Sequence, residues 1–533
     1  MEYPSLNLNN NIFQKNISLK FKSIKNKKTN QSRKELCFPK KFKYQLPQLF
    51  VKEFINPNTP YKGLLLYHKI GSGKTCAAIQ IAEQWKDIRK VFIITPASLI
   101  ANMYQELRGE CTGNSYVSKE ERELLNNLNK DSLEYINLIK NINKKINKIY
   151  KIYSHNKFVN LINSNSINLR NSLIIIDEVH NIISESGTLY TTFYNFIINA
   201  PDSLRIVLLT ATPIVDKPSE LGLTINLLRP KHILPIGNAF NNTFIQDMQI
   251  NNSNELQQYL NGYVSYFKGA PSKVFPIQQF KLINCRMSRM QYNMYSKIRT
   301  KESKNKEINL NQYLDIQNNF FIKSRIASNI LLNSELNINK LKIYSCKFYK
   351  LLKKLNYSRG TVFIYSTFKE FGGIKSLVKV LEQNGYTDFS KDGPGNQRFA
   401  MWTGNETSAY KSNILSQFND ISNQNGSKLK ILLGSPSMKE GISLLRVREV
   451  HILEPHWNMS RIKQIIGRAI RFCSHKDVDK NKRIVKVYLY CATSPKGNTT
   501  IDQYIYSIAL EKEKLINQFE KLLQESAVDK DIY

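Results

Sequence analysis

The feature that most constrains this chain is a short apolar run that leads directly into a loop of glycines, a lysine and a threonine. Residues 64–67 form the apolar run, and residues 76–82 beyond the loop carry apolar side chains at helical spacing. The loop consists of His68, Lys69, Ile70, Gly71, Ser72, Gly73, Lys74 and Thr75. This order predicts a buried strand, a phosphate-cradling loop and a helix, and therefore an α/β fold with a parallel sheet.

The chemistry of this loop follows from its residue types. Backbone N–H groups of a glycine-rich loop wrap a phosphate at the positive end of the following helix. In such loops the lysine, here Lys74, reaches the β- and γ-phosphates, and the hydroxyl of the next residue, here Thr75, ligates Mg²⁺. The first glycine of the usual pattern is replaced by His68, so a loop without a nucleotide role is the competing interpretation.

A second apolar run ends in two adjacent carboxylates. Residues 173–176 are entirely apolar, and Asp177, Glu178 and His180 follow them closely. Because adjacent side chains at a strand end diverge, Asp177 can hold Mg²⁺ through water while Glu178 orients or deprotonates the attacking water. A structural role alone would leave an acidic pair at a buried strand end without a cation, which is costly.

A third apolar run repeats the design with hydroxyls. Residues 205–209 lead into Thr210, Ala211 and Thr212. The two hydroxyls can hydrogen-bond the acidic pair on one side and serve a nucleic-acid surface on the other. This predicts that the segment Thr210, Ala211 and Thr212, together with His180, couples hydrolysis to movement. Near the chain start, Gln48 can present a donor and an acceptor to an adenine edge, although an exposed helix glutamine needs no such role.

The alternation of strands and helices returns at residues 361–366 and predicts a second α/β lobe. Its last motif, residues 464–471, reads Gln-Ile-Ile-Gly-Arg-Ala-Ile-Arg. On a helix Gln464, Arg468 and Arg471 would share one face, because they are four and three residues apart. The arginines are then either a surface stripe of charge or, facing a triphosphate, groups that stabilise its transition state.

These four motifs, in this order across two lobes, resemble those of the superfamily 2 helicases with the DExH form of the second motif. Residues 56–79, 216–218, 287–295 and 457–477 are also similar to the helicases of large cytoplasmic DNA viruses, among them the poxvirus early transcription factor small subunit and DNA-dependent nucleoside triphosphatase. The helicases of yeast cytoplasmic linear killer plasmids are similar in the same way. The segment around residues 291–295 resembles the Swi2/Snf2 translocases, which move on duplex DNA without separating its strands.

The resemblance implies two tandem RecA-like lobes that use ATP and Mg²⁺. The residues it assigns to ATP, Mg²⁺ and hydrolysis are Lys74, Thr75, Asp177, Glu178, Gln464, Arg468 and Arg471. Four hydroxyl residues stand where such enzymes touch the nucleic-acid backbone: Thr95, Ser366, Thr403 and Ser435. Related sequences usually have glycine where Lys69 stands, so this side chain either crowds the loop or adds a cation near the triphosphate.

The chain divides into five predicted segments. Residues 1–41 form a basic, disordered arm, 42–232 the first lobe, 233–345 a connecting helical module, 346–495 the second lobe, and 496–533 a helix packed on the second lobe. Within the first lobe, residues 112–150 are an insert whose lysine-rich helix carries an apolar seam up to Tyr153. This seam packs on its own lobe or, alternatively, on a coiled-coil partner.

The composition of the chain indicates which kind of partner it binds. A formal charge of +35 favours a polyanion, nucleic acid before an anionic membrane, although the wealth of Asn, Lys and Ile also fits drift in an AT-rich gene. No run of about 18 apolar residues and no secretion-signal core occurs, so no membrane span is predicted. Seven scattered cysteines without metal-ligand spacing predict free thiols in a reducing, cytoplasmic compartment.

The sequence therefore predicts an ATP-dependent helicase or translocase that moves on nucleic acid, DNA rather than RNA, and serves cytoplasmic transcription or replication of a viral or extrachromosomal genome. A cytoplasmic RNA polymerase or replication complex is the expected protein partner. The alternative is a transcription-complex scaffold that binds DNA through its basic surfaces and uses ATP only to stay closed.

Overall fold

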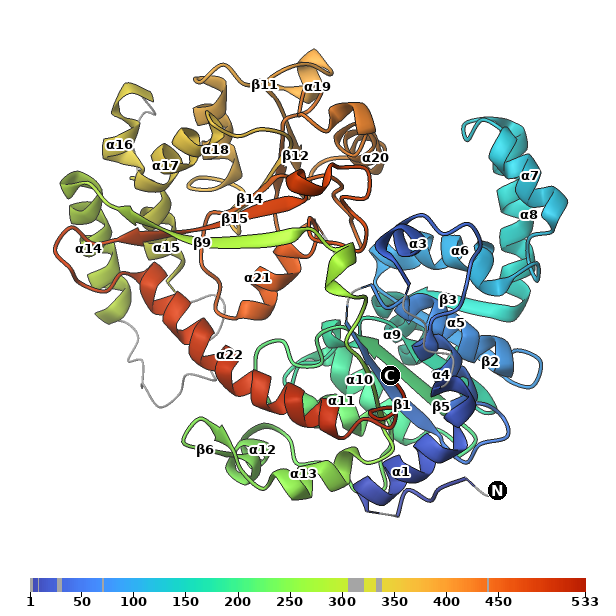
Figure 1. Cartoon of the computed structure of the whole chain (residues 1–533). Coiled ribbons are helices and arrows are strands. Elements are labelled where there is room, and N and C mark those ends of the chain that lie inside the picture. Colours follow the sequence, from blue (N-terminus) through green and yellow to red (C-terminus); the bar gives the residue numbers. More distant parts are fainter. Residues whose placement is uncertain are drawn as a thin grey trace. The chain divides into compact units, whose positions relative to one another are not determined.

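The computed structural model describes residues 3–7, 9–25, 31–69, 71–304, 321–331, 338–438 and 441–533. The chain divides into two compact units (Figure 1). Unit 1 comprises Met1–Ala270 together with Lys514–Tyr533, and unit 2 comprises Pro271–Glu513. Each unit is built around its own parallel sheet, as the two predicted α/β lobes require.

Unit 1 contains a six-stranded sheet whose strands all run parallel. In spatial order they are β3 (Tyr150–Ser154), β2 (Lys90–Thr95), β4 (Ser172–Ile176), β5 (Arg205–Thr210), β1 (Gly63–His68) and β8 (Val264–Phe267). Strands β1 and β4 are buried along their whole length, because helices cover both faces of a parallel sheet. The register sets Tyr67 of β1 opposite Thr210 of β5, so the phosphate loop and the Thr-Ala-Thr segment leave the sheet at the same edge.

Four helices of unit 1 precede its first strand: α1 (Asn10–Lys20), α2 (Lys22–Lys25), α3 (Arg33–Cys37) and α4 (Leu46–Phe54). The helices that come after β1 are α5 (Lys74–Trp85), α6 (Ile100–Arg108), α7 (Lys119–Asn127), α8 (Leu133–Ile149), α9 (His155–Asn163), α10 (Thr188–Ile198), α11 (Glu220–Asn226), α12 (Gly237–Phe244) and α13 (Ser253–Leu260). Helix α5 is buried at eight of its twelve residues, which fixes the loop in front of it.

The basic N-terminal arm is folded over most of its length, contrary to the prediction of disorder. Helix α1 buries Phe13 and Ile17 in the core of unit 1. Gln14 Nε2 donates to the backbone oxygens of Glu525 and Ala527 at 2.7 and 2.9 Å. The lysines dominate the composition of the arm, but three or four apolar residues at helical spacing are enough to dock it.

The insert forms two helices, α7 and α8, that project from the edge of the unit 1 sheet (Figure 1). Ile142 and Ile146 are the buried residues of α8, and they join the core of unit 1. Packing on its own lobe is therefore confirmed for the seam. The seam does not continue to Tyr153 as a helix, because residues 150–154 form the edge strand β3.

Unit 2 contains a seven-stranded parallel sheet. In spatial order its strands are β11 (Thr387–Asp388), β12 (Arg398–Trp402), β13 (Ile431–Gly434), β10 (Val362–Tyr365), β14 (Glu449–Ile452), β15 (Ile484–Thr493) and β9 (Ile277–Arg286). The helices around it include α14 (Arg289–Lys304), α15 (Ile322–Asn329), α17 (Cys346–Leu355), α18 (Ile374–Glu382), α20 (Ser408–Phe418) and α21 (Met459–Ile466).

No separate connecting module is present among the residues that the structure describes between 233 and 345. Residues up to Ala270 belong to unit 1, where β8 pairs with β1. From Pro271 onward the chain belongs to unit 2, where β9 pairs with β15 over ten residues. The prediction was wrong because strand pairing between distant segments is invisible to local periodicity. Residues 305–320 and 332–337 of the predicted module lie outside the described part.

The final helix, α22 (Ile501–Glu525), serves both units. Ile501, Ile505 and Ile508 lie in the core of unit 2, as predicted. Beyond residue 513 the chain belongs to unit 1, and Val528 and Ile532 lie in its core. The prediction that the whole tail packs on the second lobe is therefore wrong for its last 20 residues, Lys514–Tyr533.

The cysteines also differ from the prediction. Cys76 of α5 and Cys111 form a disulfide, whereas Cys285, Cys346 and Cys491 are buried free thiols. Two thiols 35 residues apart in sequence meet because α5 packs against the short helical turn at residues 110–112. No helix in the described residues is both long enough and apolar enough to cross a membrane.

Candidate active site

The phosphate loop runs from the end of β1 to the first turn of α5. Gly71 and Gly73 have φ values of +80° and +66°, a region that L side chains rarely adopt. A Cβ atom on Gly73 would lie 2.3 Å from Gln48 Nε2. The Ser72 hydroxyl is buried and has no hydrogen-bond partner among the described residues. These features fit a loop whose polar groups are completed by a bound phosphate.

Gln48 is buried in α4 and braces this loop. Its Nε2 donates to the carbonyl of Gly73 at 3.2 Å, and its Oε1 accepts from the backbone N–H of Gln45 at 2.8 Å. The interpretation of Gln48 as an exposed helix glutamine is therefore wrong. Its amide keeps one further N–H, so contact with an adenine edge stays a prediction.

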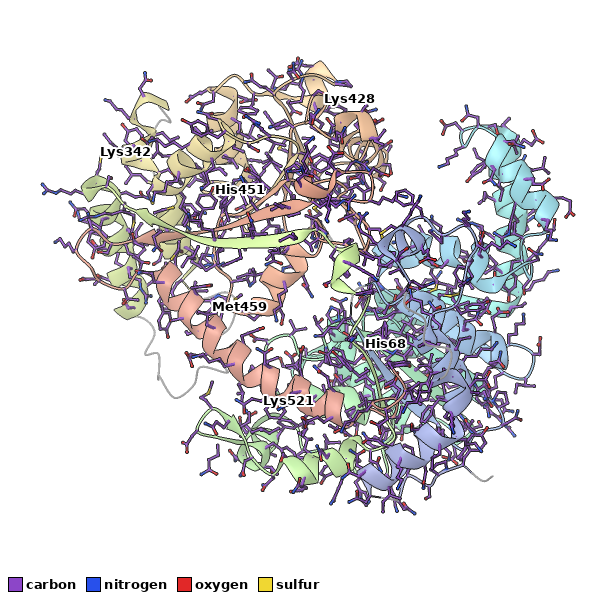
Figure 2. The ribbon with its side chains drawn as sticks, viewed as in Figure 1. His68, Lys342, Lys428, His451, Met459 and Lys521 are labelled. Carbon is purple, nitrogen blue, oxygen red and sulfur yellow. A yellow bond between two sulfur atoms is a disulfide. The ribbon has the colours of Figure 1, made fainter. Side chains whose placement is uncertain are left out.

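The first side chains of the loop face the protein. His68, which is labelled in Figure 2, is completely buried. Its Nε2 lies 2.9 Å from Ser265 Oγ. Lys69 Nζ forms an ion pair with Glu520 at 3.0 Å. Both side chains were predicted among the nucleotide-binding residues, but their contacts direct them to strand β8 and to helix α22. Ile70, predicted in the same set, lies outside the described residues.

The two carboxylates of the acidic pair occupy different environments. Asp177 is buried, with its Oδ2 accepting from the Thr95 hydroxyl at 3.2 Å and its Oδ1 from the Glu178 N–H at 3.0 Å. Burial, and then the charge of Glu178, raise the pKa of Asp177 to about 7, while Lys74 opposes the shift. Glu178 Oε1 lies 4.0 Å from Lys74 Nζ. The pair diverges at the strand end, as predicted.

This arrangement fits a divalent cation. Two neighbouring carboxylates, one of them buried, concentrate negative charge that Lys74 offsets only in part, and a divalent cation would supply the rest. Asp177 and the Thr75 hydroxyl at the start of α5 are the residues of this site that would hold it. Mg²⁺ is commonly bound by one or two protein oxygens together with substrate phosphates, so a dedicated cage of side chains is not required.

His180 connects the acidic pair to the Thr-Ala-Thr segment. Its Nδ1 lies 3.5 Å from Glu178 Oε2 and 3.0 Å from Thr210 Oγ1. Thr210 Oγ1 in turn accepts from the Thr212 N–H at 3.0 Å. The predicted link from the hydroxyls to the acidic pair therefore runs through the imidazole of His180. Ala211 lies between the two threonines, and its methyl side chain cannot take part in this link.

Sequence reasoning missed Glu220, which holds the chain just beyond this segment. Its carboxylate accepts from the N–H groups of Val215 and Asp216 at 2.6 and 3.2 Å. Burial, more than the nearby charge of Asp216, raises the pKa of Glu220 to about 7. No sequence signal distinguishes it, because a glutamate in the first turn of a helix is common.

In unit 2 the predicted arginine helix ends early. Helix α21 stops at Ile466, so Gln464 lies in its last turn whereas Arg468 and Arg471 lie in the turns that follow. Arg468 is buried, and Arg471 Nε donates to the carbonyl of Gly467 at 3.0 Å. The prediction of one helix over residues 464–471 is therefore wrong. Gly467 is the C-cap residue of the helix, and the low helix propensity of glycine fits an end at this point.

The four hydroxyls predicted to contact nucleic acid all lie at strand ends, as expected, but all are buried: Thr95, Ser366, Thr403 and Ser435. Thr95 donates to Asp177, Ser366 to Glu454 at 2.7 Å, and Thr403 to Glu406 at 2.9 Å. Ser435 Oγ lies 2.8 Å from Ser437 Oγ. Because these hydroxyls are satisfied inside the protein, direct contact of their side chains with a phosphate backbone does not fit the structure.

Comparison with known proteins identifies the family of this chain. Residues 19–215 match the family model described as "Type III restriction enzyme, res subunit", and residues 346–473 match "Helicase conserved C-terminal domain". The putative ATP-dependent RNA helicase R563 of Acanthamoeba polyphaga mimivirus is 45% identical, over 99% of this chain and 96% of that protein.

Two more distant viral relatives are similar over most of this chain. A termination factor NPH-I homolog of African swine fever virus is 26% identical over 88% of this chain and 76% of its own length. The putative helicase 087L of Invertebrate iridescent virus 3 is 28% identical over 91% of this chain, which spans about half of that protein. The chain therefore belongs to the superfamily 2 DExH helicases and resembles those of large DNA viruses, as its relatives, its two parallel sheets and its phosphate loop beside an acidic pair together indicate.

Proposed function

We propose that this enzyme hydrolyses ATP to ADP and phosphate in order to move along nucleic acid, and that its track is DNA. The observation that carries the proposal is the position of Glu178, 4.0 Å from Lys74 and 3.5 Å from His180. Its distance from Lys74 supports a role in orienting a water at the γ-phosphate, and its distance from His180 supports a role in transmitting the result.

Each residue of the candidate site has its own role in the proposed hydrolysis of ATP. Lys74 and the N–H groups of the loop hold the phosphates, and Glu178 orients the attacking water and accepts its proton. Thr75 and Asp177 would hold Mg²⁺, which would neutralise charge on the phosphate oxygens. Arg468 and Arg471 supply positive charge to the transition state. In comparable systems an arginine in this role accelerates transfer by about 10³–10⁵-fold.

Coupling to movement follows the path from Glu178 through His180 to Thr210 and Thr212. A change at the γ-phosphate alters the hydrogen bonds of Glu178, and His180 passes the change to the segment after β5. The buried hydroxyls at the strand ends, such as Ser366, then act as supports of the loops that grip the backbone, rather than as contacts themselves.

A polyanionic track is supported by charge. The formal charge of the chain is +35, and helix α8 carries exposed lysines one turn apart at 140, 144 and 148. Within the described part of the chain these three lysines form no ion pair. A row of unpaired ammonium groups about 6 Å apart concentrates positive charge on one face of the helix, which favours a polyanion.

The biological setting is proposed from the relatives. The relatives named above are viral, and one is named a termination factor. We infer a role in cytoplasmic transcription or replication of a viral or extrachromosomal genome, with an RNA polymerase or a replication complex as partner. Since the relative with 45% identity is named an RNA helicase, RNA is the competing track.

The test is the steady-state ATPase rate at low salt with no polymer, single-stranded DNA, duplex DNA and RNA. We expect duplex DNA to stimulate the rate most, and Lys74→Ala and Glu178→Gln to abolish the stimulated rate. Stimulation by RNA alone would exclude the DNA track. A rate that no polymer changes, or that persists in Lys74→Ala, would favour the scaffold over the translocase.

A further inference from the structure

Residues 514–533 return to unit 1, although all of unit 2 precedes them in sequence. Val528 and Ile532 are buried in the core of unit 1, and the Val528 N–H donates to the carbonyl of Val264 at 2.8 Å. The Tyr533 ring packs edge-on against Phe267, with ring centroids 5.2 Å apart. The segment is thus fixed along strand β8, next to the strand that leads into the phosphate loop.

Asp529 brings a buried carboxylate to this strand. Its Oδ2 accepts from the hydroxyls of Ser265 at 2.5 Å and Tyr533 at 3.0 Å, and its Oδ1 accepts from the Tyr266 N–H at 2.8 Å. Burial raises the pKa of Asp529 to about 6, against the opposing hydrogen bond from Ser265. At neutral pH the carboxylate is therefore ionised and accepts all three hydrogen bonds.

Ser265 passes this contact on to His68, the first residue of the phosphate loop. Both side chains are completely buried, and His68 Nε2 lies 2.9 Å from Ser265 Oγ. Since the single hydroxyl proton is donated to Asp529, Ser265 Oγ accepts from the Nε2–H of His68. Burial, together with the charge of Lys74, lowers the pKa of His68 to about 3, so the ring is neutral and its orientation is set by this one hydrogen bond.

Glu520 of α22 makes a second contact, with the second residue of the loop. Its Oε2 lies 3.0 Å from Lys69 Nζ, and the same ammonium lies 4.7 Å from the centroid of the Tyr67 ring. The Lys69 N–H also donates to the carbonyl of Phe267 at 2.9 Å. Lys69 therefore neither crowds the loop nor offers its charge to the triphosphate, because helix α22 holds its side chain.

We infer that Asp529 and Glu520 are positioning residues for ATP binding. Asp529 orients His68 through Ser265, and Glu520 restrains Lys69, the next residue of the loop. The inference rests on the proposed use of this loop for ATP. A loop presents its N–H groups to a phosphate only if its backbone is already held in place, and here the usual first glycine is absent. The C-terminal segment, from a distant part of the chain, supplies contacts that hold the first two residues of the loop in place.

A purely structural role would have different consequences. If the two carboxylates only dock the C-terminal segment, their loss lowers the thermal midpoint of unfolding but leaves the affinity of folded protein for ATP unchanged. A positioning role changes the affinity well below the midpoint, and it couples Glu520 to Lys69 specifically.

The experiment is an equilibrium titration of full-length protein with a fluorescent ATP analogue and Mg²⁺, at a temperature at which each variant is folded. Glu520→Ala and Lys69→Ala are each expected to weaken binding about tenfold, and the double variant no more than either single one, because both remove the same ion pair. Glu525→Ala is the matched control, since this glutamate is on the same helix and, among the residues that the structure describes, its carboxylate pairs with the exposed Lys521 alone. Additive losses, or a dissociation constant equal to that of wild type, would overturn the inference.

The His68 relay is tested in the same assay. Ser265→Ala and Asp529→Asn are expected to weaken binding about tenfold, with kcat at saturating ATP within about threefold of wild type. His68→Gln, which keeps an N–H near the place of Nε2, should bind better than His68→Leu. If the two bind alike, the relay does not position the loop. If wild-type protein binds no ATP, the proposed function itself is wrong. If Asp529→Asn does not fold, the comparison of Glu520→Ala, Lys69→Ala and their double variant decides the inference.

Discussion

At the scale of single residues, the phosphate loop depends on Gly73 having no side chain. Its φ of +66° disfavours any L residue, and the space of a Cβ atom is taken by the amide of Gln48. The same amide donates a hydrogen bond to the Gly73 carbonyl. This hydrogen bond therefore requires that position 73 has no side chain. Lys74 and Thr75 follow immediately and inherit their position from this contact.

We therefore expect Gly73→Ala to weaken ATP binding by at least about tenfold, because both the backbone strain and the displaced Gln48 shift the loop. Titration with a nucleotide analogue measures the effect. Gly393→Ala is the matched control, since Gly393 has the same φ of +66° but open space around its Cβ position. Equal affinity of the Gly73 variant and wild type would show that the loop tolerates a side chain here.

Glu220 predicts a dependence of stability on pH. Its pKa of about 7 in the fold lies above the ordinary value of 4.5, so the folded protein binds the proton more tightly than the unfolded chain. The free energy of unfolding therefore falls as the pH rises from 4.5 to 7, by at most about 3 kcal/mol from this group. Glu220→Gln cannot ionise and should lose this part of the dependence. Thermal midpoints of both proteins at pH 4.5, 5.5 and 7 measure it, and parallel curves would contradict the assignment.

At the scale of elements, helix α8 separates its two faces sharply. Ile142 and Ile146 attach it to the core, while the lysines at 140, 144 and 148 are exposed. The apolar face needs only two buried residues to hold the helix, which leaves a long basic face for solvent or a ligand. A nucleic-acid backbone is the ligand that a row of exposed lysines favours, because each ammonium group can neutralise a phosphate.

Replacing these three lysines by alanine should weaken duplex DNA binding and reduce the slope of log affinity against log salt by about 2–3, because each lost phosphate contact removes about 0.9. Affinities at several salt concentrations measure the slope. The control is a triple variant of Lys342, Lys391 and Lys496, which are exposed lysines on unit 2 and change the net charge equally. The same loss of slope in the control would mean that α8 contributes only through the net charge.

At the scale of the whole molecule, bonds between distant segments hold each unit together. Strand β8 joins the sheet of unit 1 some 200 residues after β1. The final segment then adds Val528 and Ile532 to the same core. The disulfide between Cys76 and Cys111 closes a loop around strand β2 and helix α6, directly after the phosphate loop.

Removing this disulfide should destabilise unit 1 by about 3–4 kcal/mol, the loop-closure entropy for a separation of 35 residues. We expect Cys76→Ser/Cys111→Ser to unfold at a lower temperature than wild type without reductant, and the difference to shrink when both proteins are fully reduced. Thermal scans with and without reductant measure it. A difference that reductant leaves unchanged would trace the loss to packing rather than to the bond.

The sequence by itself determined the local parts of this protein. Apolar runs that end in glycines, carboxylates or hydroxyls specify strands, their order and the chemistry at their ends, because each pattern is complete within about ten residues. The phosphate loop, the acidic pair with His180, and the two parallel sheets were predicted in this way. The family followed from the order of the motifs.

Only the tertiary structure decided what lies against these parts. The burial of Thr95 and Ser366 depends on Asp177 and Glu454, which are more than 80 residues away in sequence. The docking of the N-terminal arm likewise depends on distant residues in the core of unit 1. The clearest case is the phosphate loop, whose first two residues are held by Glu520 and, through Ser265, by Asp529. A serine in a strand and two acids in a tail carry no local signal, because their role arises only when folding brings them to the loop.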